Sequence, residues 1–212
     1  MPDPQDLSPY FTTVHDLLAG GGGPLDWDAF FGHAGTPRPV ELDIGCGRGK
    51  FLFESVEAHP DTDWCGVEID YKEGRRGAKR IAKRELPNGR VVGGDAREFL
   101  AKLVRPGSVD RAHVYFPDPW WKRRHRRRRL FNDAFLDQLA EVLKPGGELL
   151  SRTDVPDYWE VISALVDNDR RFERLPTPEV PEAEHDLDYA TSFERKARKK
   201  GVVIDLGSWR RV

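Results

Sequence analysis

Residues 40–51 read VELDIGCGRGKF, and this stretch decides the fold that we expect. Val40–Ile44 is a short apolar run typical of a buried strand, and it leads directly into a glycine-rich turn. Gly45, Gly47 and Gly49 allow the backbone to adopt dihedral angles that are barred to other residues and to approach a ligand closely. The stretch therefore predicts a strand that ends at a ligand-binding turn.

The sequence after this turn alternates between strand-like and helical patterns. Strands are expected at residues 40–44, 64–69, 91–92, 112–116, 148–153, 172–175 and 202–206, and helices at about 50–58, 72–85, 97–103, 131–143 and 157–166. Asn132 or Asp133 can cap the helix over 131–143, and the run Lys144-Pro-Gly-Gly147 should end it. Regular alternation predicts a Rossmann-like α/β fold, with a mostly parallel central sheet and helices on both faces.

The chain of 212 residues is long enough for one such domain. We expect it over residues 38–212, after a loosely ordered extension over 1–37 that contains four consecutive glycines. No apolar run approaches the roughly 20 residues that span a bilayer, and the N-terminus does not resemble a signal peptide. Cys46 and Cys65 are too few for a structural zinc site, and no other metal site is expected. A cytoplasmic protein with reduced cysteines is therefore expected.

The positive charge is concentrated in one segment, although the net charge is only −2. Residues 122–129 read KRRHRRRR, with seven cations in eight positions, whereas residues 179–188 are mainly acidic. A solvated face or a localisation signal would also be basic, but a signal would not lie between a strand and a helix. The segment therefore predicts a local docking surface for a polyanion.

Three acidic residues accompany the ends of the first three expected strands. Asp43 precedes the glycine turn, Glu68 ends the second strand, and Asp95 follows the third. Each alone would be interpreted as a cap or turn residue, but ligands of such sheets bind beyond the carboxyl ends of the strands. The G-x-G-x-G spacing is one residue short of the dinucleotide pattern, which favours a nucleoside without a pyrophosphate. The sulfonium, amino group and ribose hydroxyls of S-adenosylmethionine suit these carboxylates.

The most specific stretch, YFPDPWWKRRH over residues 115–125, follows the fourth expected strand. Asp118 lies between two prolines that fix the backbone, and Trp120 and Trp121 come directly before the cations. A proline-stiffened loop with two partly buried tryptophans would explain the prolines but not the aromatic residues beside seven positive charges. A stacking surface next to phosphate-binding charge is what an RNA site for an unstacked base requires.

This stretch resembles the signature of the bacterial tRNA (guanine(46)-N(7))-methyltransferases. The matching residues are Phe116-Pro-Asp118-Pro-Trp120, Lys122, Arg124-His125 and Arg128-Arg129-Leu130, followed by Thr153-Asp154 with Tyr158 and by Thr191-Ser-Phe-Glu194. The resemblance covers roughly residues 40–206 and implies a class I methyltransferase fold. This chain departs from the family pattern at Asp43, where many members have glutamate, and in its denser run of arginines.

The resemblance implies methyl transfer from S-adenosylmethionine to N7 of a variable-loop guanosine in tRNA, with S-adenosylhomocysteine as the product. Asp118 would be the catalytic residue. The implied cofactor contacts, together with the glycine turn, are Asp43, Gly45, Gly47, Gly49, Glu68, Asp95 and Asp118. The implied contacts with the guanosine or its surroundings are Lys122, Asp154, Thr191, Ser192, Phe193 and Glu194. No membrane and no obligatory protein partner is expected, and the protein would be a monomer or a homodimer.

Some of these assignments have structural alternatives. Asp154 could cap the helix that contains Tyr158, and Glu194 could pair with a neighbouring cation. Trp120 is the aromatic residue that we favour for stacking on the target base, although Trp121 is adjacent.

Three other classes of function share parts of this pattern. Methyltransferases of exocyclic amines in DNA or RNA carry two prolines after an acid or amide, whereas Asp118 is followed by one. An NAD-dependent oxidoreductase would share the glycine turn, but the glycine spacing is short and no hydride-handling group is evident. A catalytically silent RNA-binding module is disfavoured by Asp118 and the intact glycines.

Overall fold

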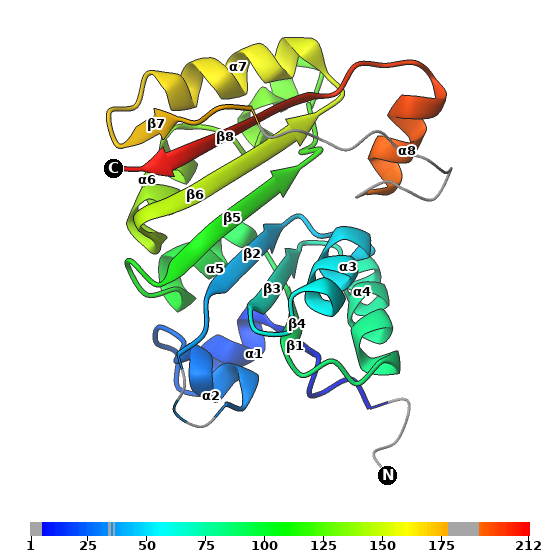
Figure 1. Ribbon diagram of the computed structural model, residues 1–212, viewed down its shortest axis with the longest axis vertical. Helices are drawn as coiled ribbons and strands as arrows, with labels where there is room; N and C mark the ends of the chain where they lie inside the picture. The colour runs from blue at the N-terminus through cyan, green and yellow to red at the C-terminus, as the bar shows by residue number, and fades with distance from the viewer. Residues whose placement is uncertain (1–5, 34, 36, 178–190) are drawn as a thin grey trace.

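One eight-stranded sheet organises the computed structural model, which describes residues 6–33, 35, 37–177 and 191–212 (Figure 1). The strands lie in the order β1-β4-β3-β2-β5-β6-β8-β7. Their bounds are β1 (Phe11–Thr13), β2 (Val40–Ile44), β3 (Asp63–Glu68), β4 (Gly89–Gly93), β5 (Val109–Tyr115), β6 (Leu143–Thr153), β7 (Phe172–Arg174) and β8 (Asp205–Arg211). Strands β1 to β6 pair in parallel, and β8 pairs antiparallel with β6 and β7. The predicted mostly parallel sheet is confirmed.

Helices cover both faces of this sheet. They are α1 (Val14–Ala19), α2 (Trp27–Phe31), α3 (Lys50–Ala58), α4 (Tyr71–Lys83), α5 (Ala96–Leu103), α6 (Asp133–Val142), α7 (Pro156–Asp167), α8 (Ser192–Lys199) and the 3₁₀ helix η1 (Arg123–Arg128). Helices α3 and α4 pack around Trp64 and Val91 on one face. The next residues along these strands, Cys65 and Val92, belong to the larger core, to which α1, α5 and α6 contribute. Alternation of side chains along each strand therefore supplies both layers.

The described part of the N-terminal segment is packed, which corrects the prediction of a loosely ordered extension over residues 1–37. Strand β1 pairs with β4 at one edge of the sheet. Val14, Trp27 and Phe31 are buried in the main core. Burial of these large apolar side chains stabilises the segment despite its glycine run. Each fully buried side chain of this kind contributes about 1.5–3 kcal/mol.

Two predicted elements differ from the observed ones. The sequence predicts the last strand at residues 202–206, but β8 spans Asp205–Arg211, where core-facing Trp209 precedes exposed Arg210. The valines before it are exposed instead. The glycine–proline run after α6 also lies within β6, where the register with β5 shifts: Val109 is paired with Leu143, but Arg111 is paired with Glu148. Asn132 caps α6 as predicted, accepting a hydrogen bond of 3.0 Å from the Phe135 N–H.

The topology fixes where a ligand can bind. The strand order reverses at β2, which lies between β3 and β5. In open α/β sheets the crevice beyond the carboxyl ends of the strands at such a reversal is the binding site. None of the helices in the described part of the chain combines the length and apolar character that crossing a bilayer requires.

Candidate active site

A cavity of about 680 Å³ lies beyond the carboxyl ends of β2, β3, β4 and β5. Five residues that the sequence predicts as cofactor contacts line it, namely Gly45, Gly47, Glu68, Asp95 and Asp118. They come from four different strand ends, so the parallel sheet brings them together. The volume of the cavity lies in the range of small-molecule sites.

The glycine turn forms one wall of this cavity. Gly45 and Gly47 have φ angles of +81° and +54°, and an added Cβ at either would meet no described heavy atom within 4 Å. Backbone conformation, rather than crowding, therefore requires glycine here, and the turn leaves room for a ligand. The Gly47 N–H donates to Glu68 Oε2 at 2.8 Å, while Glu68 Oε1 accepts from the Asp70 N–H at 2.8 Å. Glu68 thus ties the turn to the start of α4.

Gly49, which the sequence groups with the other two glycines, is not part of the cavity wall. Its φ is +62°, and an added Cβ would lie 2.8 Å from the Cα of Gly77 in α4. Real Cβ atoms essentially never approach so closely. Gly49 is therefore required where α3 and α4 pack against each other.

Asp43 is buried, with 3% of its surface exposed, and it lies beside the cavity rather than in its wall. Burial and the negative charge of Glu68 raise its pKa to about 8. No cation among the described residues offsets these effects. A cationic group brought close would therefore favour the ionised carboxylate.

Asp95 both caps a helix and lines the cavity. It caps α5 by accepting a hydrogen bond of 2.9 Å from the Arg97 N–H, and it lines the cavity. The Arg97 guanidinium also donates to it at 2.9 Å, and this hydrogen bond is the main reason why the pKa of Asp95 is lowered. The carboxylate is thus held ionised and fixed in direction.

Asp118 lies exposed at the rim of the cavity, on a segment with unusual backbone angles. Phe116 and Trp120 on either side have φ angles of +53° and +43°. Such conformations cost about 1–3 kcal/mol each in non-glycine residues and are concentrated at functional sites. Trp120 lines the cavity, whereas Trp121 is 63% exposed. The structure therefore places Trp120, and not Trp121, at the cavity.

The cationic segment divides into two parts. Lys122, Arg126 and Arg127 are exposed, with the latter two on η1. Arg128 lines the cavity, 5.0 Å from the centroid of the Trp120 ring. Arg129 donates to the Pro119 carbonyl at 2.7 Å and lies over the Tyr158 ring. Arg128 and Arg129 therefore contact the loop and Tyr158, whereas Lys122, Arg126 and Arg127 face solvent.

Glu194 is buried and does not line the cavity. Its carboxylate lies 3.6 Å from the Arg152 guanidinium, which in turn lies 4.8 Å from the centroid of the Tyr115 ring. Its N–H donates to Thr191 Oγ1 at 3.0 Å, at the start of α8. The alternative that Glu194 pairs with a cation is thus observed, although the pair is buried. The side chains of Ser192 and Phe193 lie outside the described residues.

Asp154 is half-buried and does not line the cavity. Its alternative role as the cap of α7 is not observed, because the N-cap residue is Val155, and the described residues provide no side-chain cap there. Contact of Asp154 with the guanosine therefore stays a prediction.

Tyr115 and Ile69 line the cavity, although the sequence did not indicate either as a site residue. The Tyr115 hydroxyl lies 2.9 Å from His113 Nδ1, and His113 Nε2 lies 2.7 Å from the Glu41 carboxylate. The pKa of His113 is lowered, because burial disfavours the charged ring by more than the contact with Glu41 favours it. Polar residues at every second position of β5 were the available signal, since they indicate a polar sheet face.

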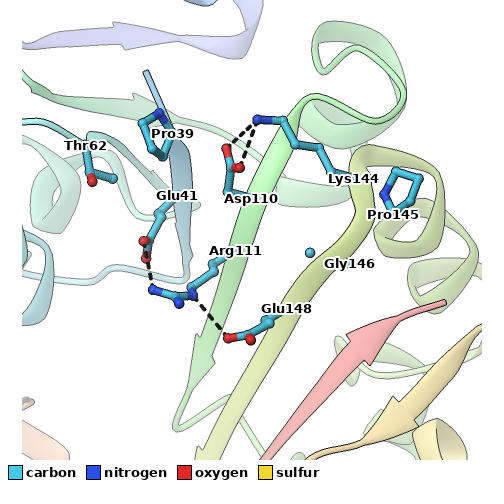
Figure 2. A pocket seen from close by; sticks show the side chains of 10 residues that line it. Pro39, Glu41, Thr62, Asp110, Arg111, Lys144, Pro145, Gly146 and Glu148 are labelled. Carbon is cyan, nitrogen blue, oxygen red and sulfur yellow. Dashed lines mark hydrogen bonds and ion pairs between the residues drawn. The ribbon is translucent and has the colours of Figure 1, made fainter. Parts of the chain in front are cut away.

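A second cavity, of about 400 Å³, lies at the opposite end of β2 and β5 (Figure 2). Lys144 pairs with Asp110 at 2.7 Å, and Arg111 lies 3.4 Å from Glu41 and 3.1 Å from Glu148. The charged side chains that line it satisfy one another, as the dashed lines in Figure 2 show. This arrangement stabilises the start of the strands and does not indicate a ligand.

Comparisons with known proteins agree with this geometry. Residues 37–205 match a family model described as putative methyltransferase. The chain is 37% identical to a tRNA (guanine-N(7)-)-methyltransferase of Rhodopirellula baltica over 94% of this chain and 73% of that protein. It is 38% identical to a protein of the same name from Ralstonia pickettii, over 88% and 69%. The crystal structure of the aminoglycoside resistance methyltransferase NpmB1 shares the fold, with a TM-score of 0.58, 22% identity, and coverage of 84% and 89%.

Proposed function

Since this chain belongs to the tRNA (guanine-N(7)-)-methyltransferase family, we propose that it transfers a methyl group from S-adenosylmethionine to N7 of a variable-loop guanosine in tRNA. The observation that carries the proposal is the cavity at four strand ends. The glycine turn and several carboxylates line this cavity, and a cationic segment adjoins its rim.

The residues of the cavity fit S-adenosylmethionine. Gly45 and Gly47 leave space beside the backbone, and Glu68 and Asp95 present carboxylates to the same cavity. Asp43 is a buried carboxyl whose charged form a neighbouring cation would stabilise. When bound, S-adenosylmethionine supplies an electrophilic methyl group on a positively charged sulfur. These residues would hold its polar and cationic groups.

The chain contributes alignment and charge stabilisation to the reaction. Guanine N7 is unprotonated at neutral pH, so no general base is needed, and orientation of the base is the main requirement. Positive charge develops on the purine as the methyl group is transferred. The Asp118 carboxylate at the rim would stabilise that charge, and Pro117 and Pro119 restrict its backbone.

The target base must leave its stack to enter the cavity. Extrusion of a nucleotide costs a few kcal/mol, which stacking and phosphate contacts offset. Trp120 offers an aromatic surface at the cavity, and the exposed arginines of η1 offer phosphate contacts. We propose these as the contacts that capture the flipped guanosine.

The proposal is tested by incubating the purified protein with tRNA and isotopically labelled S-adenosylmethionine. Mass spectrometry of the digested nucleosides should show the label in 7-methylguanosine. A label on adenine N6 or cytosine N4 would instead identify a methyltransferase of exocyclic amines.

Neutralising Arg126 and Arg127 should weaken tRNA binding and reduce its salt dependence. Both side chains are exposed, whereas Arg128 and Arg129 also hold the loop and are left intact. Each lost phosphate contact should lower the slope of log K against log salt by roughly 0.7–0.9. Affinity for S-adenosylhomocysteine should stay unchanged. A Gln double variant with the salt slope of the wild type would contradict the docking assignment.

The ionisation of Asp43 should make cofactor binding depend on pH. Its pKa is about 8 in the folded protein and near 3.8 in an unfolded chain, so the folded state keeps a proton that the unfolded state has lost. The stability of the free protein should therefore fall as pH rises from about 4 to 8. Affinity for the cationic cofactor should rise over pH 6–8, because the ionised carboxylate attracts it.

Calorimetry and thermal unfolding of Asp43→Asn provide the measurement. This variant should lose the pH dependence of cofactor affinity and gain thermal stability relative to the wild type near pH 8. Identical pH profiles for the two proteins would show that Asp43 does not interact with the cofactor.

A further inference from the structure

The exposed side of α4 carries positive charge that the cavity does not use. We propose that it is a second phosphate-binding surface for tRNA, an inference that rests on the proposed function. The helix contains one acid, Glu73, and six cations, all of which are exposed: Lys72, Arg75, Arg76, Lys79, Arg80 and Lys83. Its opposite side is buried and consists of glycine, alanine and isoleucine.

Four of these cations form a straight stripe. Lys72, Arg76, Lys79 and Lys83 are spaced by four, three and four residues, which places them on one side of a helix. At 1.5 Å per residue the stripe is about 16 Å long, enough to follow several nucleotides of a strand. Arg76 shares Glu73 with Arg48, but Lys72, Lys79 and Lys83 have no carboxylate partner among the residues that the structure describes.

A merely solvated helix does not explain this stripe well. Like charges three or four residues apart repel each other and destabilise the helix. The helix dipole favours Lys83 in the last turn but disfavours Lys72 in the first. A polyanion lying along the stripe would relieve both effects.

The stripe begins at the edge of the cavity. Asp70, which caps α4, and Glu73 in its first turn both line the cavity on the side of β3 and β4. Arg128 lines it from the segment after β5, and β2 lies between these strands. Cationic surfaces therefore flank the cavity on two sides. An RNA whose base enters the cavity would present backbone phosphates to both.

Helix α4 is also fixed in place. Gly77 packs against the backbone of Gly49, and Gly74 against Phe11 and Val91. Figure 1 shows α4 beside α3 on the outside of the sheet. A surface held in this way can bind phosphates without ordering a mobile segment, which lowers the entropic cost of binding.

The test is the triple variant K72Q/K79Q/K83Q, which removes three unpartnered charges and leaves the cavity residues intact. Its control is R105Q/R170Q/R210Q, which removes three exposed charges at the opposite end of the sheet. Binding of an unmodified tRNA transcript is measured by filter binding between 50 and 250 mM KCl. The α4 variant should bind roughly tenfold or more weakly at 100 mM KCl, and its salt slope should fall by about two to three. The control should retain the slope of the wild type.

Binding of S-adenosylhomocysteine and the thermal transition report whether each variant is folded. The affinity should match the wild type, and the thermal midpoint should not fall below it. A salt slope for the α4 variant equal to that of the control would overturn the inference while leaving the methyltransferase proposal intact. Wild-type protein that neither binds nor methylates tRNA would overturn both. An unfolded triple variant would be replaced by the single variant K79Q, whose slope should fall by about one.

Discussion

Asp118→Asn is expected to lower kcat by roughly 10²–10³-fold while S-adenosylhomocysteine affinity falls by less than tenfold. The substitution keeps the shape of the side chain and removes the charge that we propose stabilises the positive purine. Asp118 is exposed at the cavity rim, so loss of its charge should not disturb folding. Single-turnover kinetics with saturating tRNA measure the chemical step directly.

A matched control for this experiment is Asp61→Asn, an exposed acid in the loop before β3 at the opposite end of the sheet. That variant should retain the activity of the wild type. If Asp118→Asn also transferred methyl groups at the wild-type rate, alignment alone would account for catalysis and Asp118 would have no catalytic role.

Gly49→Ala is expected to destabilise the protein by about 3 kcal/mol and to lower the thermal midpoint by about 10 °C. Two effects add at this position. The φ of +62° strains any residue with a Cβ, and that atom would lie 2.8 Å from the Gly77 backbone. Because the added atom would meet the backbone of Gly77 rather than a flexible side chain, the contact between α3 and α4 itself must shift.

Gly47→Ala is the informative comparison for Gly49→Ala. Its φ of +54° also strains an alanine, but the added Cβ would meet no described atom within 4 Å. We therefore expect a loss of only about 1 kcal/mol in stability, together with a marked loss of cofactor affinity. Calorimetry and thermal unfolding of both variants separate packing from binding. Equal destabilisation by the two substitutions would contradict the assignment of Gly49 to helix packing.

Local patterns were sufficient wherever a residue acts through its own segment. The run VELDI predicted β2 because it is apolar and short, and Asn132 caps α6 as its side chain allows. Patterns failed where distant packing decided the outcome. The glycine run suggested disorder before residue 38, yet burial of Trp27 and Phe31 holds that segment against the core. Val202 and Val203 suggested a strand, but pairing with β6 begins at Asp205.

The site shows the same division between local and tertiary information. That Glu68, Asp95 and Asp118 share a cavity followed from their places at strand ends, because parallel strands end at one edge. The difference between Trp120 and Trp121 did not follow, since it depends on a positive φ and on Arg128. The pKa of Asp43 depends likewise on burial and on Glu68, which is 25 residues away in the sequence.

The sequence by itself determined the α/β class, the glycine turn, the acids at the strand ends and the family motifs, because each depends on residue type and spacing along a few residues. Only the tertiary structure decided that Gly49 serves a helix contact, that Glu194 is buried against Arg152, and that α4 aligns a cationic stripe with the cavity edge. These features arise between segments far apart in the chain. Their energies depend on distance and burial, which a sequence pattern does not contain.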